Sequence, residues 1–273
     1  MNARWLLFAL ALMLSACSNS PVKTDEKTER QYYQEAREAL DNENFLVAME
    51  RLRQLDSRYP FGQYAEQGQL DMMYAHFMTA DMESVLTASE RFIRLHPLHS
   101  QVDYAYYLRA LATYELGFSF VERYLSDDVA RRDPTPMRDA FAHFSELLIR
   151  FPDSPYTADA RARMEFLRQR LASYEVEVAR YYMKRHAFIA AANRCQDVLL
   201  HYQNTAAVAD ALAVMVEAYD ELGMSDEKAN ALALLQHNHP QHPQLNDGRF
   251  VSSGLAQADR GSLLNILSFG LLD

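Results

Sequence analysis

The stretch ERQYYQEAREALDNENFLVAMERLRQLDSRYP, residues 29–60, contains the pattern from which the fold of this chain follows. Apolar residues recur at helical spacing on either side of a polar turn at residues 41–44. The stretch ends in an aromatic residue and a proline, and proline stops a helix because it has no backbone N–H to donate. It therefore predicts two helices joined by a short turn.

The same ending recurs along the chain, which indicates an internal repeat. Its members are Tyr59-Pro60, His96-Pro97, Phe151-Pro152, the degenerate Tyr202-Gln203, and His239-Pro240. Two intervals lie close to the tetratricopeptide period of about 34 residues, and two are longer and leave room for inserts, one at 115–136. Because no such helix pair buries its apolar face alone, the pairs are expected to stack. An ordinary helical bundle is the alternative.

One segment predicts a longer helix. Residues 156–185 contain neither glycine nor proline, and apolar residues follow at alternating steps of four and three: Ala160, Met164, Leu167, Leu171, Tyr174, Val178 and Tyr181. This heptad pattern is typical of one continuous helix with a single apolar stripe. The sequence thus predicts an all-α fold: a right-handed superhelical solenoid of about five tetratricopeptide-like helix pairs, with one long helix near 156–185 that joins the third and fourth repeats.

The N-terminus has the features of a secretory signal. Its apolar run, residues 5–14, is about half of the roughly 20 residues that a membrane-spanning helix needs. The following LSAC at 14–17 resembles the lipobox of bacterial lipoproteins. This resemblance implies that residues 1–16 are a signal peptide and that Cys17 carries N-palmitoyl and S-diacylglycerol groups. Serine rather than aspartate after the cysteine implies export to the outer membrane, and the polar residues 17–29 are expected to form a lipidated flexible tether.

The second cysteine leaves two interpretations. A disulfide between Cys17 and Cys195 is possible because exported proteins occupy an oxidising compartment. However, the two cysteines have very different surroundings: Cys195 lies within a helical pattern, whereas Cys17 follows the apolar run of the signal. A small buried thiol is therefore the favoured interpretation of Cys195.

The composition and motifs exclude several classes of function. A formal net charge of −10 disfavours nucleic acid as a partner, because such binding needs basic residues to neutralise phosphates. The sequence has no glycine-rich phosphate loop and no hydrolase, metalloprotease or paired-cysteine motif. His237, His239 and His242 are expected to follow a helix as loop residues rather than to bind a metal. We therefore expect no enzyme activity, no metal and no cofactor beyond the lipid.

Tyrosines are the candidate binding residues. The first helix of each stacked pair lines the concave face, and a tyrosine offers flat contact area with a polar tip. Those expected on first helices are Tyr33, Tyr64, Tyr74, Tyr104, Tyr107 and Tyr114. Most should pack between repeats, with a few facing the groove. The long helix carries an excess of arginine, so it presents either a solvated face or a surface for an acidic partner.

The C-terminal extension, residues 244–273, begins polar and ends in the apolar segment SLLNILSFGLLD. It is too short to span a membrane. The expected role is a cap on the last repeat, which protects the end of a stacked core. Docking on a partner and shallow insertion into the membrane interface are the alternatives.

Several stretches resemble the BamD family, the lipoprotein subunits of the bacterial outer-membrane β-barrel assembly machinery. They are RYPFG at 58–62, RFIRL at 91–95, Asp103-Tyr104 with Tyr107 and Arg109, RDP at 132–134, and Tyr181-Tyr182 followed by Asn193-Arg194. With the lipobox, they extend from Cys17 to about Pro240. The resemblance implies a lipid-anchored protein at the periplasmic face of the outer membrane.

The resemblance also implies two binding halves. Repeats 1–3, residues 30–152, would bind C-terminal, aromatic-ending signals of unfolded outer-membrane proteins, and the peptide-groove candidates are Tyr59, Phe61, Tyr64, Tyr74, Tyr104 and Tyr107. Repeats 4–5, residues 153–243, would dock on the periplasmic domains of the barrel subunit and on other lipoprotein subunits, and the docking candidates are Arg180, Arg185, Asn193 and Arg194. The substitution Arg194→Glu is expected to weaken assembly while leaving the fold intact.

Two other functions stay open at the level of sequence. A pilotin-like repeat lipoprotein that assembles a secretin or a pilus would have the same anchor and repeats. Only the matches at residues 59–62 and 132–134 favour barrel assembly over it. A lipid-anchored cell-wall enzyme is disfavoured because no catalytic constellation appears and the repeats occupy nearly the whole body.

Overall fold

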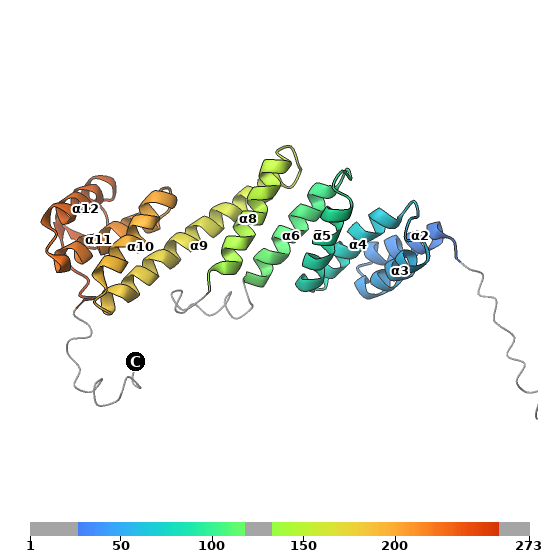
Figure 1. Ribbon diagram of the computed structural model, residues 1–273, viewed down its shortest axis with the longest axis horizontal. Coiled ribbons are helices and arrows are strands. Elements are labelled where there is room, and N and C mark those ends of the chain that lie inside the picture. The colour runs from blue at the N-terminus through green and yellow to red at the C-terminus, as the bar shows by residue number, and fades with distance from the viewer. Residues whose placement is uncertain (1–26, 118–132, 257–273) are drawn as a thin grey trace, which may run out of the picture. The chain divides into compact units, whose positions relative to one another are not determined.

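The computed structural model describes residues 27–117 and 133–256, which form helices and one short hairpin (Figure 1). These residues divide into two units at Gln69 and Leu70. In the first unit, α2 (Glu29–Asp41) packs against α3 (Phe45–Arg58). Gly68 lies close to Leu55. A Cβ atom at this glycine would come within 3.1 Å of the leucine side chain.

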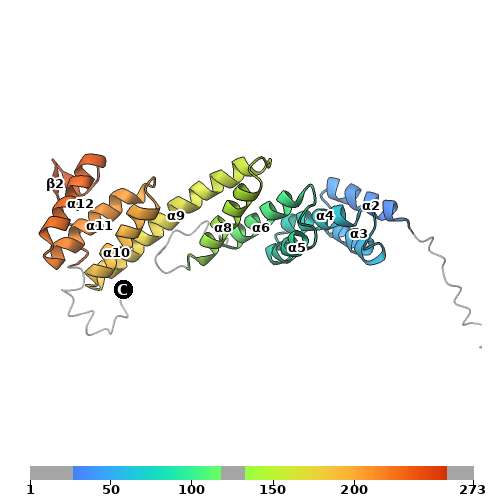
Figure 2. The same ribbon diagram turned by 45° about the horizontal axis from the view of Figure 1, so that its top comes forward.

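The second unit is a run of helices in which neighbours in the chain pack against one another (Figures 1 and 2). It starts within α4 (Ala65–Met78) and continues through α5 (Met82–Leu95), α6 (Val102–Gly117), α8 (Thr135–Arg150), α9 (Thr157–Lys184), α10 (Phe188–His201), α11 (Ala207–Leu222) and α12 (Ser225–Asn238). Within the described residues, the helices form the five predicted pairs, and the predicted long helix is α9. Part of the predicted insert, residues 118–132, lies outside the described residues.

The second helix of four pairs begins in the same way. One residue with a positive φ angle directly precedes the N-cap: Glu43, Ala80, His186 or Gly223. At two of these starts the cap is a polar side chain, since Asn44 accepts a hydrogen bond from the Val47 N–H and Asp81 from the Ser84 N–H. Each of these four second helices is then 14 residues long. The turn predicted at residues 41–44 is therefore confirmed, and three later pairs repeat its geometry.

All five second helices also end alike, at the residues that the repeat pattern picked out. Their C-caps are Tyr59, His96, Phe151, Tyr202 and His239, with φ angles between −126° and −134°. Each cap N–H still donates to the carbonyl four residues earlier, after which the chain leaves the helix. A residue before proline avoids the helical region for steric reasons, which explains four of the five endings.

Helix α9 connects two parts of the core. Ala160 and Leu167 are buried with α5, α6 and α8, whereas Val176, Ala179 and Met183 are buried with α10 and α11. The predicted heptad stripe is therefore wrong beyond Leu171: Tyr174 and Val178 are only partly buried, and Tyr181 is 52% exposed. The buried face moves around the helix because its two halves pack against different neighbours.

A hairpin follows the last helix and was missed by the all-α prediction. Strand β1 (Leu245–Asn246) pairs antiparallel with β2 (Arg249–Phe250). The turn residues Asp247 and Gly248 have φ angles of 48° and 73°, as a two-residue type I′ turn requires. Phe250 and the buried Ala256 pack on the core formed with α11 and α12. Residues 245–256 thus cap the last helix pair as expected, whereas 257–273 lie outside the described residues.

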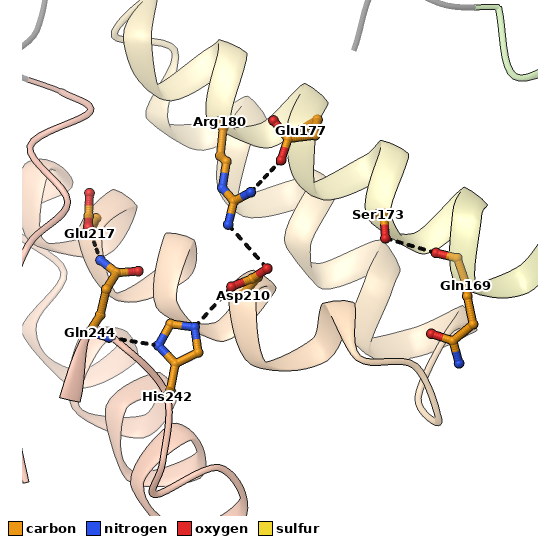
Figure 3. Close-up of polar contacts among 8 residues, drawn as sticks. All are labelled: Gln169, Ser173, Glu177, Arg180, Asp210, Glu217, His242 and Gln244. Carbon is orange, nitrogen blue, oxygen red and sulfur yellow. Dashed lines mark hydrogen bonds and ion pairs between the residues drawn. The ribbon is translucent and has the colours of Figure 1, made fainter. Parts of the chain in front are cut away.

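Buried polar side chains hold this cap on α11 (Figure 3). Glu217, which is 6% exposed, accepts hydrogen bonds from Gln244 Nε2 at 2.6 Å and from the N–H and hydroxyl of Ser253 at 2.6 and 2.9 Å. Two turns earlier on the same face, Asp210 meets His242 Nε2 at 3.0 Å. The Gln244 N–H donates to His242 Nδ1, so Nε2 carries the proton and donates to Asp210.

Two further expectations concern single side chains and membrane-spanning segments. Cys195 is a buried free thiol, which confirms the favoured interpretation, and burial raises its pKa to about 12, so the thiol stays protonated. Its possible disulfide partner, Cys17, lies outside the described residues. Within the described ranges, no helix has both the length and the apolar character needed to cross a membrane. The same ranges contain no cluster of side chains suited to a metal. The His242 ring forms a hydrogen bond with Asp210.

Candidate protein-binding surfaces

Tyr59, Phe61 and Tyr64 belong to a turn of the first unit. The Tyr59 hydroxyl donates to the Lys27 carbonyl at 3.1 Å. The Tyr64 N–H donates to Glu29 Oε1 at 2.6 Å, and the Tyr64 ring stacks on Tyr33 with centroids 4.6 Å apart. These contacts fix the turn against the start of α2, while the Phe61 side chain stays 98% exposed.

Gly62 lets this turn approach α2 closely. A Cβ atom at Gly62 would come within 2.1 Å of Glu29 Oε1. That carboxylate also receives the Tyr64 N–H, so it could not move away without breaking the hydrogen bond. The backbone of the RYPFG stretch is therefore fixed in place, while its phenylalanine stays exposed. An exposed aromatic side chain of this kind is suited to contact with another protein.

In the second unit, two first helices place tyrosines beside one another. Tyr107 of α6 stacks on Tyr156, at the start of α9, with ring centroids 4.5 Å apart and an interplanar angle of 12°. Tyr104 lies 5.5 Å from the same ring. The Tyr107 hydroxyl donates to Asp159 Oδ2 at 2.8 Å, and burial with this hydrogen bond raises the pKa of Tyr107 to about 12. The phenol therefore keeps its proton and remains a donor.

The aromatic surface continues along the same two helices through cation–π contacts. The Arg163 guanidinium lies 5.0 Å from the Tyr114 ring centroid, and its Nε donates to Asp159 Oδ2 at 2.6 Å. The Tyr114 ring meets Phe166 edge-on at 6.4 Å, and Phe166 is 45% exposed. We call this set the α6–α9 ladder; it consists of Tyr104, Tyr107, Tyr114, Tyr156 and Phe166.

The structure thus divides the predicted groove residues between the units. Tyr59, Phe61 and Tyr64 lie in the first unit, and Tyr104 and Tyr107 lie in the ladder of the second. Tyr74, on α4 in the second unit, is 37% exposed and close enough to Tyr104 for its charge to contribute to the raised pKa of that phenol, after the larger effect of burial. The assignment of these residues to peptide binding stays a prediction.

Sequence reasoning missed Tyr156, although a signal for it existed. Tyr156 follows the Phe151 ending by the same interval that separates Tyr64 from Tyr59. Both tyrosines stack on a tyrosine of an earlier first helix, with interplanar angles of 13° and 12°. A comparison of repeats position by position would have placed the two stacked pairs in equivalent sites.

The docking candidates on α9 and α10 differ in their surroundings. Arg180 is held by Glu177 and by Asp210, which lies 3.2 Å away (Figure 3). Arg185 caps the end of α9 through its backbone N–H and has an exposed side chain. Asn193 is exposed on α10. Arg185 and Asn193 therefore present exposed side chains, whereas ion pairs hold the side chain of Arg180.

Arg194 is engaged with a buried carboxylate. Its Nη1 lies 3.0 Å from Glu175 Oε2, and the Glu175 side chain is only 6% exposed. Glu175 Oε1 also accepts a hydrogen bond from Arg138 Nη2 at 2.8 Å. Arg194→Glu would set a second carboxylate beside a buried one, which is strongly unfavourable. The expectation that this charge reversal leaves the fold intact is therefore revised, and a neutral substitution is the better probe of docking.

Comparisons with known proteins place the chain in one family. A family model described as "Outer membrane lipoprotein" (YfiO) matches residues 25–235. The Vibrio cholerae outer membrane protein assembly factor BamD is 41% identical over 85% of this chain and 96% of its own length. The BamD of Neisseria meningitidis serogroup A is 41% identical over 88% of this chain and 92% of its own.

A solved tetratricopeptide repeat protein from Parabacteroides merdae aligns at 14% identity with a TM-score of 0.36, covering 81% of this chain and 70% of that one. This alignment is too loose to support an argument. The family model and the relatives, by contrast, each extend over most of the chain. The chain therefore belongs to the BamD family of outer membrane lipoproteins.

Proposed function

We propose that this protein is a non-catalytic scaffold for the assembly of β-barrel proteins in the outer membrane. Its relatives carry the name outer membrane protein assembly factor, and helix-repeat folds serve widely as binding surfaces. The scaffold would bind the C-terminal signals of unfolded outer-membrane proteins and would dock on the periplasmic domains of the barrel subunit and on other lipoprotein subunits.

The observation that carries the peptide-binding role is the α6–α9 ladder. A C-terminal signal that ends in an aromatic residue needs a surface that offers ring contacts and a positive charge for the α-carboxylate. Rings at centroid distances of 4.5–7 Å attract one another, and guanidinium groups bind carboxylates strongly. The partly exposed rings of the ladder lie beside Arg163, which contacts Tyr114 and uses its Nε–H for Asp159, so its other N–H groups are the candidates for the α-carboxylate.

Loss of a ladder ring is expected to weaken peptide binding. We expect Tyr107→Ala to raise the Kd for a synthetic peptide with a C-terminal phenylalanine about tenfold, because a buried aromatic contact at an interface is typically worth more than 1 kcal/mol. Fluorescence anisotropy with a labelled peptide measures this directly. Tyr181→Ala is the matched control, since Tyr181 is 52% exposed and contacts Tyr182 outside the ladder. Equal affinities for both variants would contradict the assignment.

We propose that the anchor is the lipid on Cys17, which lies outside the described residues. An N-palmitoyl group together with S-diacylglycerol supplies several acyl chains, and two or more chains hold a protein stably on a membrane. Mass spectrometry of the N-terminal peptide from membrane-extracted protein should show a lipid-modified cysteine at position 17. An unmodified cysteine there, or retention of residues 1–16, would refute the anchor.

A further inference from the structure

The face of α9 that contributes to the α6–α9 ladder continues one turn beyond the last ring. Residues three or four positions apart lie on the same face of a helix, and such steps connect Tyr156, Asp159, Arg163, Phe166 and Arg170. The Arg170 guanidinium lies over the Phe166 ring, with its Cζ atom 6.0 Å from the ring centroid. The ladder is thus followed directly by a guanidinium group in contact with its last ring.

The two arginines on either side of Phe166 differ in their partners. Arg163 donates its Nε–H to Asp159 Oδ2 at 2.6 Å, so a carboxylate already balances its charge. Arg170, by contrast, pairs with no carboxylate among the described residues. Its cation–π contact forms no hydrogen bond, so the five N–H donors of this guanidinium remain for a ligand.

Carboxylates gather at the opposite end of the ladder. Burial raises the pKa of Tyr156, and the nearby charge of Asp103 raises it further. Burial also raises the pKa of Tyr104, with a smaller contribution from Asp71. Asp159 lies at this end as well, one turn into α9. A ligand carboxylate would be repelled by these groups, so it is better placed at the other end of the ladder.

The end near Phe166 has fewer acidic groups on the two ladder helices. Glu115 of α6 follows Tyr114 in the chain, and it has an interaction of its own. Glu165 of α9 accepts a hydrogen bond from Gln169 at 2.9 Å and lies off the ladder face. Neither carboxylate pairs with Arg170. A ring receptor and a carboxylate receptor therefore lie side by side at this end.

We propose that a C-terminal signal lies along the ladder in one direction, with its terminal aromatic ring on Phe166 and its α-carboxylate on Arg170. This inference rests on the proposed peptide-binding function and adds a direction and a specificity-determining residue to it. The terminal ring and the α-carboxylate belong to one residue, so their receptors must be neighbours. Phe166 is 45% exposed and offers ring contact, and a guanidinium group binds a carboxylate through charge-assisted hydrogen bonds.

The first test compares two labelled peptides that differ only at the C-terminus, where one ends in phenylalanine with a free carboxylate and the other in phenylalanine amide. Fluorescence anisotropy with the mature full-length protein gives both Kd values. The unaltered protein is expected to bind the free acid about tenfold more tightly, because only the acid makes the charged contact. Arg170→Gln should remove this preference by weakening acid binding about tenfold and amide binding less than about twofold. Retained amide binding also shows that the variant is folded.

Two further variants separate the contact with Arg170 from general charge. Arg161→Gln is the matched control, because Arg161 is an exposed arginine on the opposite face of α9, and the variant should keep the full preference for the acid. Arg163→Gln should also keep this preference, since Asp159 already balances Arg163. Loss of the preference in Arg163→Gln but not in Arg170→Gln would overturn the assignment, and so would an equal loss in Arg161→Gln.

The second test concerns the direction of the peptide. The ladder face from Tyr156 to Phe166 is about 15 Å long at 1.5 Å per helical residue, which an extended peptide covers with about five residues. A photoreactive benzoylphenylalanine is placed either at the C-terminus or five residues before it. Mass spectrometry should find the terminal cross-link near Phe166 and the upstream cross-link near Tyr107 or Tyr156. The reverse order would overturn the proposed direction.

The outcomes distinguish this inference from the function on which it rests. If the unaltered protein bound neither the acid nor the amide, the proposed peptide-binding function itself would be refuted. If it bound both peptides equally well, that function would stand and the role of Arg170 would be overturned.

Discussion

Phe144→Ala is expected to lower the free energy of unfolding of the second unit by about 3–5 kcal/mol, the usual cost of removing a fully buried phenylalanine. Phe144 lies on α8 with no exposed surface and belongs to the core that α5, α6, α8 and the first half of α9 share. Its ring also meets Tyr114 edge-on at 6.3 Å. A cavity at this point would remove the support beneath one member of the α6–α9 ladder.

Urea denaturation followed by circular dichroism measures this loss of unfolding free energy. Two further variants serve as comparisons for its size. Phe166→Ala removes a ring of the same size that is 45% exposed, so we expect a cost of less than about 1.5 kcal/mol. Phe144→Leu keeps most of the volume and should lie between the two. If Phe144→Ala and Phe166→Ala were equally destabilising, the assignment of Phe144 to the core would be refuted.

The helix endings could be predicted from the sequence because their causes are local. Proline stops a helix wherever it occurs, and the residue before it avoids the helical region. Tyr59, His96, Phe151 and His239 therefore follow from their own neighbours in the chain. The Asp247-Gly248 turn is equally local, and the Asp-Gly pair is a strong signal for a hairpin, so this hairpin could also have been predicted from the sequence.

The buried face of α9 could not be predicted in the same way. A helical pattern shows which residues share a face, but the neighbours decide which face is buried. Leu167 packs with α6 and α8, and Val176 packs with α10 and α11. Extending one stripe along the whole helix therefore placed Tyr181 in the core, although its side chain is half-exposed.

The candidate sites show the same division. Tyr104 and Tyr107 were predicted because first helices and tyrosine chemistry are visible in the sequence. The pairing of Glu175 with Arg138 and Arg194 was not, since it requires three helices to be rotated so that their polar side chains converge. Nothing in the local sequence of α9 distinguishes Glu175 from its exposed or half-exposed acidic neighbours Glu165 and Glu177.

Glu217→Ala is expected to loosen the C-terminal cap, at a cost of about 3 kcal/mol to its local stability. The carboxylate is 6% exposed and receives three hydrogen bonds from Gln244 and Ser253, and hydrogen bonds to a charged group contribute about 1.5–3 kcal/mol each before solvent replaces part of them. The substitution leaves the donors without their partner, so opening of residues 245–256 becomes easier. Helices α5, α6 and α8 share no core with this segment and should be unaffected.

Hydrogen exchange read by mass spectrometry tests this expectation region by region, because local openings differ in free energy across a structure. Exchange should accelerate about a hundredfold in 245–256 and the adjoining part of α11, and should stay unchanged in α6 and α8. Asp226→Ala, at an exposed acidic residue in the first turn of α12, is the control and should have little effect. Faster exchange throughout 70–256 would mean that Glu217 supports the whole unit, whereas unchanged exchange in 245–256 would mean that apolar contacts of Phe250 and Ala256 hold the cap without it.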